Sequence, residues 1–316
     1  MHYTLILLAS FAAIGTAFGA EPDAAPSGVY TAEVVEGSPK MTAAGMAWWN
    51  GKLIIADRGG KRLVAFTLPD KFETIREGLT PVGLAVESDG HLVLTERDPN
   101  RVVRIKPDDT STVIAEKDIG TPQFVAVHKS GRVFWSGFPD AGTRSVAPKG
   151  EVEILSPKIG HSFGVGLSPK QDWLYVSSKL PNPELRAVWR FPLDAEGKPG
   201  KGEVFFKVQD LKPEVEKLPA ARDGGATLLG WVGRLQGMTV DSLGNIYIAG
   251  AESHTSGEAV AVVSPDGKKV VAMILGVPRN ISGLAFGGKD GRTLFITGAG
   301  EYRLHQVKLP VGGAVR

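Results

Sequence analysis

Residues 237–250 read G-M-T-V-D-S-L-G-N-I-Y-I-A-G, and this stretch decides the fold. Its apolar start leads through a polar turn with Gly244 into a run of β-forming residues, which is the pattern of two strands joined by a tight turn. The same pattern recurs along the chain, and its small third residues give the marker positions Ala47, Ala85, Ala126, Gly166, Thr239 and Ala285. The spacings between these markers are 38, 41, 40, 73 and 46 residues.

A period near forty residues, with strands as the repeating unit, is typical of propeller blades, because one four-stranded sheet cannot bury both of its faces alone. We therefore predict an all-β, six-bladed β-propeller of four-stranded antiparallel blades. The 73-residue spacing corresponds to one blade plus an insertion, at about residues 209–231. A solenoid is the alternative, but the repeats carry no helical period, and a closed ring removes exposed sheet edges.

The two ends of the chain predict how the ring closes. Residues 28–36 alternate like a strand but precede the first repeat, and residues 302–309 form one further strand after the last repeat. We predict that the N-terminal strand pairs beside residues 302–309 and completes the last blade.

Residues 1–20 have the pattern of a secretory signal peptide. Residues 5–14 are an apolar run, and small residues follow at positions 17, 19 and 20. A membrane-spanning helix would need about twenty apolar residues. We therefore expect an exported protein, periplasmic or secreted, with a short flexible linker at residues 21–27, the propeller at residues 28–316, and no membrane association after cleavage.

The composition excludes several classes of function. The chain of 316 residues has 42% hydrophobic residues, which is enough to fill one large core. It has no cysteine, so disulfides, thiol catalysis and iron–sulfur centres are excluded. Its formal net charge of +2 gives no basis for a nucleic-acid partner. We expect a small-molecule ligand or substrate instead, with a protein partner as a further possibility.

Three phrases carry a resemblance to a known family. They are V-G-L-A-V-E-S-D-G at residues 82–90, G-V-G-L-S-P at residues 164–169 and V-W-R-F-P-L-D-A-E-G-K-P-G at residues 188–200. With them the chain resembles the SMP-30/gluconolactonase/LRE family of six-bladed propellers over nearly all of the sequence after residue 27. The resemblance implies metal-dependent hydrolysis of sugar or other small lactones.

The resemblance also implies a set of metal ligands on the ring axis. The family uses a Glu from the first blade, an Asn from the fourth and an Asp from the fifth, and these positions match Ala44, Phe163 and Gln236. A third-blade Asn that helps to bind substrate matches Gln123. Hard cations need charged oxygen ligands, and none remains at these positions. We predict no cofactor, and a divalent cation such as Ca²⁺ or Zn²⁺ only if a site lies elsewhere.

Other residues are candidates for the lining of the channel. His161 precedes Phe163 by two positions, and Glu252 and His254 follow the fifth hairpin. Together with Gln123 and Gln236, these three are the predicted substrate-binding residues, although a loop histidine and a solvated turn are the alternative interpretations. No catalytic residue is predicted.

Two acidic residues end the second strands of the first two blades. Asp57 and Glu96 are each followed directly by an arginine, Arg58 and Arg97. We expect the acidic residues to cap loops or to pair with these arginines.

Two functions of different classes remain open. The first is a lactonase-like hydrolase, which the resemblance implies, and the second is a catalytically inactive propeller that binds a small carbohydrate or a protein partner. A metal-free esterase with a serine nucleophile and His161 or His254 as base is a third alternative, but no local serine motif supports it.

Overall fold

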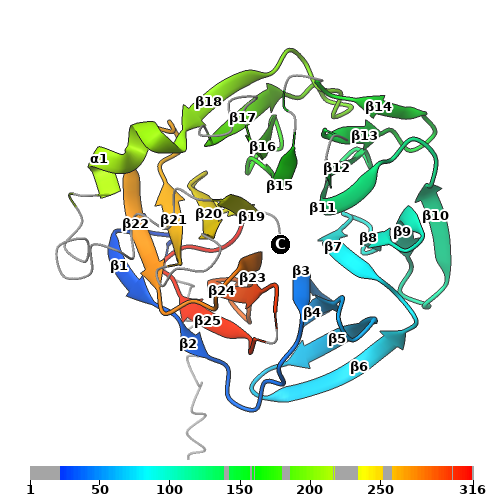
Figure 1. Cartoon of the computed structure of the whole chain (residues 1–316), viewed down its shortest axis with the longest axis horizontal. Coiled ribbons are helices and arrows are strands. Elements are labelled where there is room, and N and C mark those ends of the chain that lie inside the picture. Colours follow the sequence, from blue (N-terminus) through cyan, green and yellow to red (C-terminus); the bar gives the residue numbers. More distant parts are fainter. Residues whose placement is uncertain are drawn as a thin grey trace, which may run out of the picture.

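The fold is a closed ring of sheets. The computed structural model describes residues 22–138, 142–156, 159, 161–179, 186–215, 217, 234–251, 258–300 and 302–314. In this part of the chain six sheets surround a central axis as the blades of a propeller (Figure 1). The predicted six-bladed β-propeller of four-stranded antiparallel blades is therefore confirmed. None of the described helices is long and apolar enough to cross a membrane.

Each blade begins with its innermost strand beside the axis and continues outward in chain order (Figure 1). Blade 1 contains β3 (Ala43–Trp49), β4 (Lys52–Asp57), β5 (Arg62–Thr67) and β6 (Lys71–Glu77). Blade 2 contains β7 (Pro81–Val86), β8 (Leu92–Arg97), β9 (Asn100–Ile105) and β10 (Ser111–Ala115). Blade 3 contains β11 (Thr121–Val127), β12 (Val133–Phe138), β13 (Arg144–Val146) and β14 (Val152–Ile154).

The second half of the ring is built in the same way. Blade 4 contains β15 (Ser162–Leu167), β16 (Trp173–Lys179), β17 (Arg186–Pro192) and β18 (Glu203–Lys207). Blade 5 contains β19 (Arg234–Val240), β20 (Ile246–Ala251), β21 (Ala259–Val263) and β22 (Val270–Leu275). Blade 6 contains β23 (Ile281–Gly287), β24 (Thr293–Gly298) and β25 (His305–Lys308).

The hydrophobic core lies between neighbouring blades. Between blades 6 and 1, for example, the fully buried rings of Phe66 and Phe295 meet edge to face at 6.0 Å. Trp48 stacks on Phe295, whereas its neighbour Trp49 donates a hydrogen bond from Nε1 to the carbonyl of Gly90 in blade 2 at 2.7 Å. Adjacent strand residues point to opposite faces of a sheet, so these two tryptophans fasten blade 1 to both of its neighbours.

The N-terminal strand closes the ring differently from our prediction. β2 (Glu33–Val34) pairs antiparallel with β25 and completes blade 6, as expected. β1 (Gly28–Thr31), which we expected beside residues 302–309 as well, instead pairs parallel with β22 and adds a fifth strand to blade 5. The hydrogen-bonding edge of β22 would otherwise be open, and β1 covers it. The N-terminal segment therefore ties the last two blades together.

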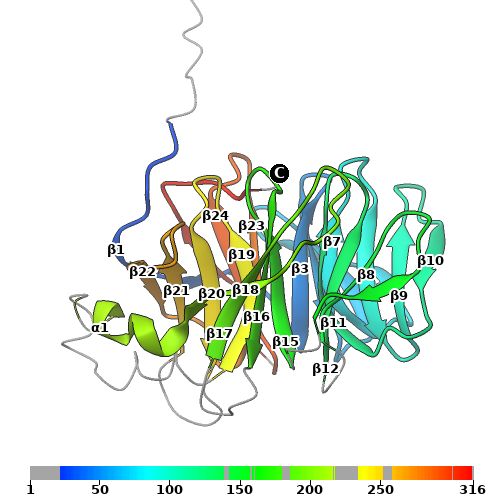
Figure 2. The same ribbon diagram turned by 90° about the horizontal axis from the view of Figure 1, so that it is seen from above.

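The insertion predicted at residues 209–231 follows β18. Its described part begins with a 3₁₀-helix, η1 (Val208–Leu211), and the short helix α1 (Lys212–Val215). Figure 2 shows α1 at the periphery of the ring, away from the axis. Residues 218–231 of the predicted insertion lie outside the described residues.

The first described residues contact the end of the chain. Residues 22–27, which we expected to form a linker, contain Asp23, and its carboxylate lies 3.1 Å from the guanidinium of Arg292. The same carboxylate accepts hydrogen bonds from the hydroxyl of Ser242 and from the backbone N–H of Gly312. Asp23 thus joins blade 5, blade 6 and the C-terminal segment.

Candidate functional site at one mouth of the channel

All six inner strands have a break in their pairing register close to the mouth of the channel where these strands begin. In each blade the register between the inner strand and the next strand shifts at this level. A Cβ atom at Gly237 would lie 2.3 Å from the carbonyl oxygen of Ser282, and one at Gly283 would lie 2.2 Å from that of Ala44. Glycine at this place therefore allows neighbouring inner strands to approach closely.

Buried hydroxyl groups take up the backbone groups that the irregularity leaves without partners. In blade 2 the Thr95 hydroxyl accepts from the N–H of Gly83 at 2.7 Å and donates to the carbonyl of Gln123 in blade 3. In blade 4 the Ser177 hydroxyl accepts from the N–H of Gly164 at 2.8 Å and lies 3.5 Å from the carbonyl of Gln236 in blade 5. These contacts fix the backbone of both candidate glutamines to the neighbouring blade.

The four positions matched to the family's ligands lie at this level of the ring. Ala44, Gln123 and Gln236 each precede a close approach between inner strands, and Phe163 occupies the same place in β15. Ala44 and Gln123 are buried, with exposed fractions of 9% and 7%, and the other two are half-buried. Among the described residues, the Gln123 side-chain nitrogen Nε2 is buried and has no hydrogen-bond partner.

The remaining predicted site residues are only partly described. His161 is half-buried and lies directly before β15, so it is close in sequence to the mouth. Glu252 and His254 lie outside the described residues, so their part in the site stays a prediction.

The structure separates the two roles predicted for Asp57 and Glu96. Asp57 caps its loop as predicted, because its Oδ1 accepts from the N–H of Gly60 at 3.1 Å, but the predicted pairing with Arg58 and Arg97 is wrong. Asp57 pairs with Arg62 at 2.9 Å, and Glu96 pairs with Arg101 at 2.5 Å. In both hairpins the acidic residue lies opposite that arginine in the strand register. Residues directly opposite one another share a face of the sheet, whereas consecutive strand residues do not, so Arg97 leaves β8 on the face opposite to Glu96. Arg58 lies in the turn that follows β4.

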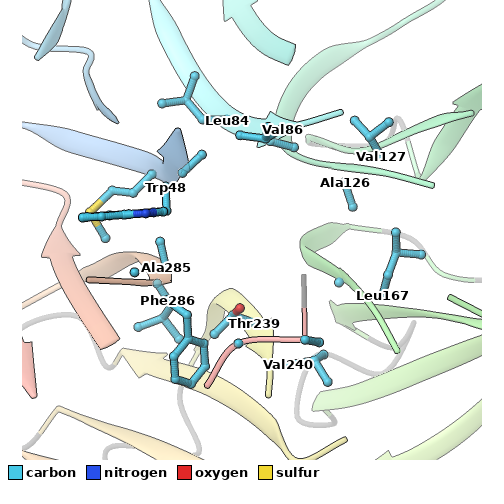
Figure 3. A pocket seen from close by; sticks show the side chains of 18 of the residues that line it. Trp48, Leu84, Val86, Ala126, Val127, Leu167, Thr239, Val240, Ala285 and Phe286 are labelled. Atoms are coloured by element: carbon cyan, nitrogen blue, oxygen red, sulfur yellow. The ribbon is translucent and has the colours of Figure 1, made fainter. Parts of the chain in front are cut away.

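The opposite half of the channel is a cavity that the sequence did not predict, with a mainly apolar lining that also includes Lys129, Lys289 and Asp290. Its volume is about 680 Å³, and Figure 3 shows aliphatic and aromatic side chains around it. The main contributors are Trp48, Leu84, Val127, Leu167, Val240 and Phe286. Gly313 and Ala314 also line it, because the N–H of Ala314 donates to the carbonyl of Val240 at 2.9 Å. The C-terminal segment thus enters this mouth.

One group of possible metal ligands lies near this second mouth. Among the described residues, Glu87, Asp89 and His91 bring ligand atoms within 4.8 Å of one another. However, both carboxylate oxygens of Glu87 accept hydrogen bonds from Arg104, at 2.5 and 2.7 Å. A fixed guanidinium charge opposes a cation at the same carboxylate, so the group is better explained as an ion-paired turn.

The chain matches one protein-family model over most of its length. The model of the SMP-30/Gluconolactonase/LRE-like region matches residues 42–300. A 6-deoxy-6-sulfogluconolactonase from Pseudomonas putida is 32% identical over 151 residues, which are 48% of this chain and 42% of that protein. A gluconolactonase from Zymomonas mobilis is 23% identical over 241 residues, which are 68% of this chain and 60% of that protein.

A pentonolactonase from Haloferax volcanii is 28% identical over 224 residues, which are 69% of this chain and 67% of that protein. The chain therefore spans between about two fifths and two thirds of the length of these curated relatives: 42%, 60% and 67%.

Solved structures with the same fold include two named proteins. Regucalcin from Agrobacterium tumefaciens, a calcium-binding protein, has a TM-score of 0.69 at 20% identity, over 91% of this chain and 97% of that one. A gluconolactonase from Xanthomonas campestris has a TM-score of 0.68 at 19% identity, over 88% of this chain and 89% of that one. At these identities the likeness shows the fold alone.

Proposed function

Because the chain belongs to the SMP-30/gluconolactonase/LRE-like family, we propose that it binds a small lactone or a related sugar derivative at the mouth formed by the starts of the inner strands. The class of ligand comes from the curated relatives, which are named as lactonases of gluconolactone, sulfogluconolactone and pentonolactone. The position comes from Gln123 and Gln236, whose backbone the ring fixes at this level.

The observation that carries the proposal is the buried amide of Gln123. Its Nε2 has no hydrogen-bond partner among the described residues. An unsatisfied buried donor costs about 1–3 kcal/mol, so a ligand oxygen that accepts from it would be bound favourably. The oxygen-rich ring and hydroxyl groups of a sugar lactone offer such acceptors.

The residues present do not fit the divalent cation that the family resemblance implies. Ala44 and Phe163 offer no ligand atom in their side chains, and Gln236 offers a neutral amide. Ca²⁺ prefers six to eight oxygen ligands, several of them carboxylates that offset its charge. We therefore propose that the ligand binds at this mouth without a cation at the family's position.

Calorimetric titration of the protein tests this proposal. We expect glucono-lactone or gluconate to bind in the presence of excess EDTA, and we expect Gln123→Leu to weaken binding about five- to tenfold, as for one lost hydrogen bond. Gln306→Leu, in the outer part of blade 6, is the matched control and should bind as the unmodified protein does. The proposal would be contradicted if the two variants bound the ligands equally well, or if the unmodified protein bound neither glucono-lactone nor gluconate.

Hydrolysis of a lactone is the second candidate function, and the three curated lactonases favour it. A general base would then come from the predicted residues Glu252 and His254 or from His161. The test is lactone hydrolysis above the spontaneous rate, measured with EDTA, for the unmodified protein and for Glu252→Gln and His254→Asn. Loss of a measurable rate in these variants would make hydrolysis the primary function.

We also propose that the chain is exported through the signal-like residues 1–20. The pattern of an apolar run followed by small residues supports this. Expression of the full chain followed by N-terminal sequencing tests it, and the expected mature protein begins at residue 20 or 21. A protein that retains its initial residues in the cytoplasm would contradict it.

A further inference from the structure

Two arginines lie at the mouth of the channel that contains Gln123. Arg58 directly follows β4, whose last residue Asp57 pairs in register with Ala43 at the start of the inner strand β3. Arg97 ends β8, and its backbone N–H donates to the carbonyl of Thr80, directly before the inner strand β7, at 3.2 Å. Both arginines therefore sit beside the points at which inner strands begin.

The two guanidinium groups have unused hydrogen-bond donors. The carboxylates that precede them in sequence form ion pairs with arginines across their own hairpins. Within the described residues, neither the Arg58 nor the Arg97 side chain forms a hydrogen bond or an ion pair, and the Nε of Arg97 is buried. Donors of this kind, held partly out of water, are suited to an acceptor that the described part of the chain does not supply.

The electrostatics of the pair also favour an anion. Burial lowers the pKa of the Arg97 guanidinium below its usual range, and the positive charge of Arg58 lowers that pKa further. An arginine stays protonated at neutral pH in spite of such a shift, so the protein holds two like charges near each other. An isolated charge in a poorly solvated position is unfavourable, and an anion between the two groups would relieve both effects.

Arg97 leaves its strand on the face that meets the inner strand containing Gln123. Thr95 and Arg97 are two residues apart in β8, so their side chains leave the same face of that strand. The Thr95 hydroxyl reaches the carbonyl of Gln123 in blade 3. Arg97 therefore leaves β8 on the side that faces the strand of Gln123.

We propose that Arg58 and Arg97 form a subsite for an oxyanion, the carboxylate, sulfonate or phosphate group of a small ligand that binds at this mouth. The inference rests on the proposed function and deepens it, because it makes that ligand an acidic sugar derivative rather than a neutral one. The planar fork of a guanidinium group donates two parallel hydrogen bonds to such a group, which gives both affinity and orientation.

Titration with matched sugars tests the subsite. The probes are gluconate, glucose 6-sulfate, glucose 6-phosphate and neutral glucose, with inorganic sulfate and phosphate as the acidic group alone. We expect the acidic sugars to bind at least about tenfold more tightly than glucose, with affinity that falls as salt is added. Arg97→Gln and Arg58→Gln should each weaken the acidic sugars about ten- to hundredfold and leave glucose unchanged.

Thermal unfolding gives an independent readout. Because Arg97→Gln removes a poorly solvated charge, the ligand-free variant should unfold at or above the temperature of the unmodified protein, yet lose the stabilisation by acidic sugars. Arg76→Gln, in the outermost strand of blade 1, is the charge-matched control and should bind every probe as before.

The outcomes separate this inference from the proposed function. Equal affinity for acidic and neutral sugars, or binding that is unchanged in folded Arg97→Gln and Arg58→Gln proteins, overturns the oxyanion subsite alone when Gln123→Leu still weakens binding. If none of the sugars binds, both the oxyanion subsite and the proposed function are overturned. If the arginine variants bound inorganic sulfate and phosphate more weakly but bound the sugars as before, the arginines would form an anion site separate from the ligand site. That result would also overturn the inference.

Discussion

Replacing Thr95 by valine tests whether hydroxyl groups hold neighbouring blades together at the candidate site. The Thr95 side chain is fully buried, and its one hydroxyl serves the N–H of Gly83 and the carbonyl of Gln123. Valine has the same branched shape but neither donates nor accepts, so the substitution leaves no large cavity and leaves two buried backbone groups unpaired. Each such group costs about 1–3 kcal/mol, so we expect Thr95→Val to lose about 3 kcal/mol of unfolding free energy.

Chemical or thermal unfolding followed by circular dichroism measures this loss. A loss of about 3 kcal/mol corresponds to a fall in Tm of roughly 5 °C for a domain of this size. Thr95→Ser keeps the hydroxyl and should lose about 1 kcal/mol, from the missing methyl group alone. Thr112→Val, on an exposed position of β10, controls for the exchange of threonine for valine at a site without these contacts.

A second measurement links the hydrogen bonds of the Thr95 hydroxyl to the candidate site. The Gln123 backbone would no longer be fixed by blade 2, so Thr95→Val should also weaken the binding of gluconate, whereas Thr95→Ser should not. Unfolding of Thr95→Val within about 0.5 kcal/mol of the unmodified protein would refute the reasoning, because surface-like substitutions produce changes of that size.

Two further predictions concern pH and stability. Hydrogen bonds from Ser242, Gly312 and Arg292 lower the pKa of Asp23. Its stabilising effect is therefore present above the ordinary value of 3.8 and is lost as the pH falls through the folded value. In thermal scans, Asp23→Asn should cost about 1 kcal/mol at pH 7 and progressively less as the pH falls below 3.8. Burial raises the pKa of Glu258, so its contribution to stability falls as the pH rises above 4.5. Glu258→Gln should therefore unfold at a higher temperature than the unmodified protein at pH 8 and at the same temperature at pH 4. Equal unfolding temperatures of the two proteins at both pH values would contradict this prediction.

The sequence repeat predicted the fold because the same packing constraint acts on the inner strands of the blades and selects the same residue types. The inner strands approach one another so closely that a Cβ at Gly237 or Gly283 would clash with the neighbouring backbone. Such positions require glycine, and glycine recurs there with the period of the blade, except in blade 3, where Phe124 follows Gln123. The hairpin that follows each one is a local structure, so its pattern of apolar and turn residues is also visible in sequence.

Pairings between distant segments left weaker signals. β1 reads as a strand, but nothing in its residues distinguishes an antiparallel place beside β25 from a parallel place beside β22. Backbone hydrogen bonds define this pairing, and they do not depend on side-chain identity. The path of the C-terminal segment into the apolar half of the channel was missed for the same reason.

The ion pairs of the first two blades show why proximity in sequence misleads within strands. Arg58 follows Asp57 directly but lies in the turn, whereas Arg62 lies across the hairpin from Asp57 on the same face of the sheet. A count of register positions from the turn would have found this pair. The correct pairing also leaves Arg58 without that partner, which is what makes it a candidate for ligand binding.

The buried donor of Gln123 could be located but not recognised from the sequence. The alignment with the family placed Gln123 at the mouth, but only the packing around it shows that Nε2 lacks a partner among the described residues. The loops that contain Glu252 and His254 lie outside those residues, so their predicted roles rest on sequence alone.

The most direct test of the account is calorimetric titration of the mature protein with Ca²⁺, Zn²⁺ and Mn²⁺, followed by titration with gluconate in EDTA. We expect no micromolar binding of any cation, because Ala44, Phe163 and Gln236 supply no charged ligand, and we expect gluconate binding that EDTA does not change. Combined Ala44→Glu, Phe163→Asn and Gln236→Asp substitutions should then create cation binding. Micromolar cation binding by the unmodified protein, with lactone turnover that depends on the cation, would contradict the account.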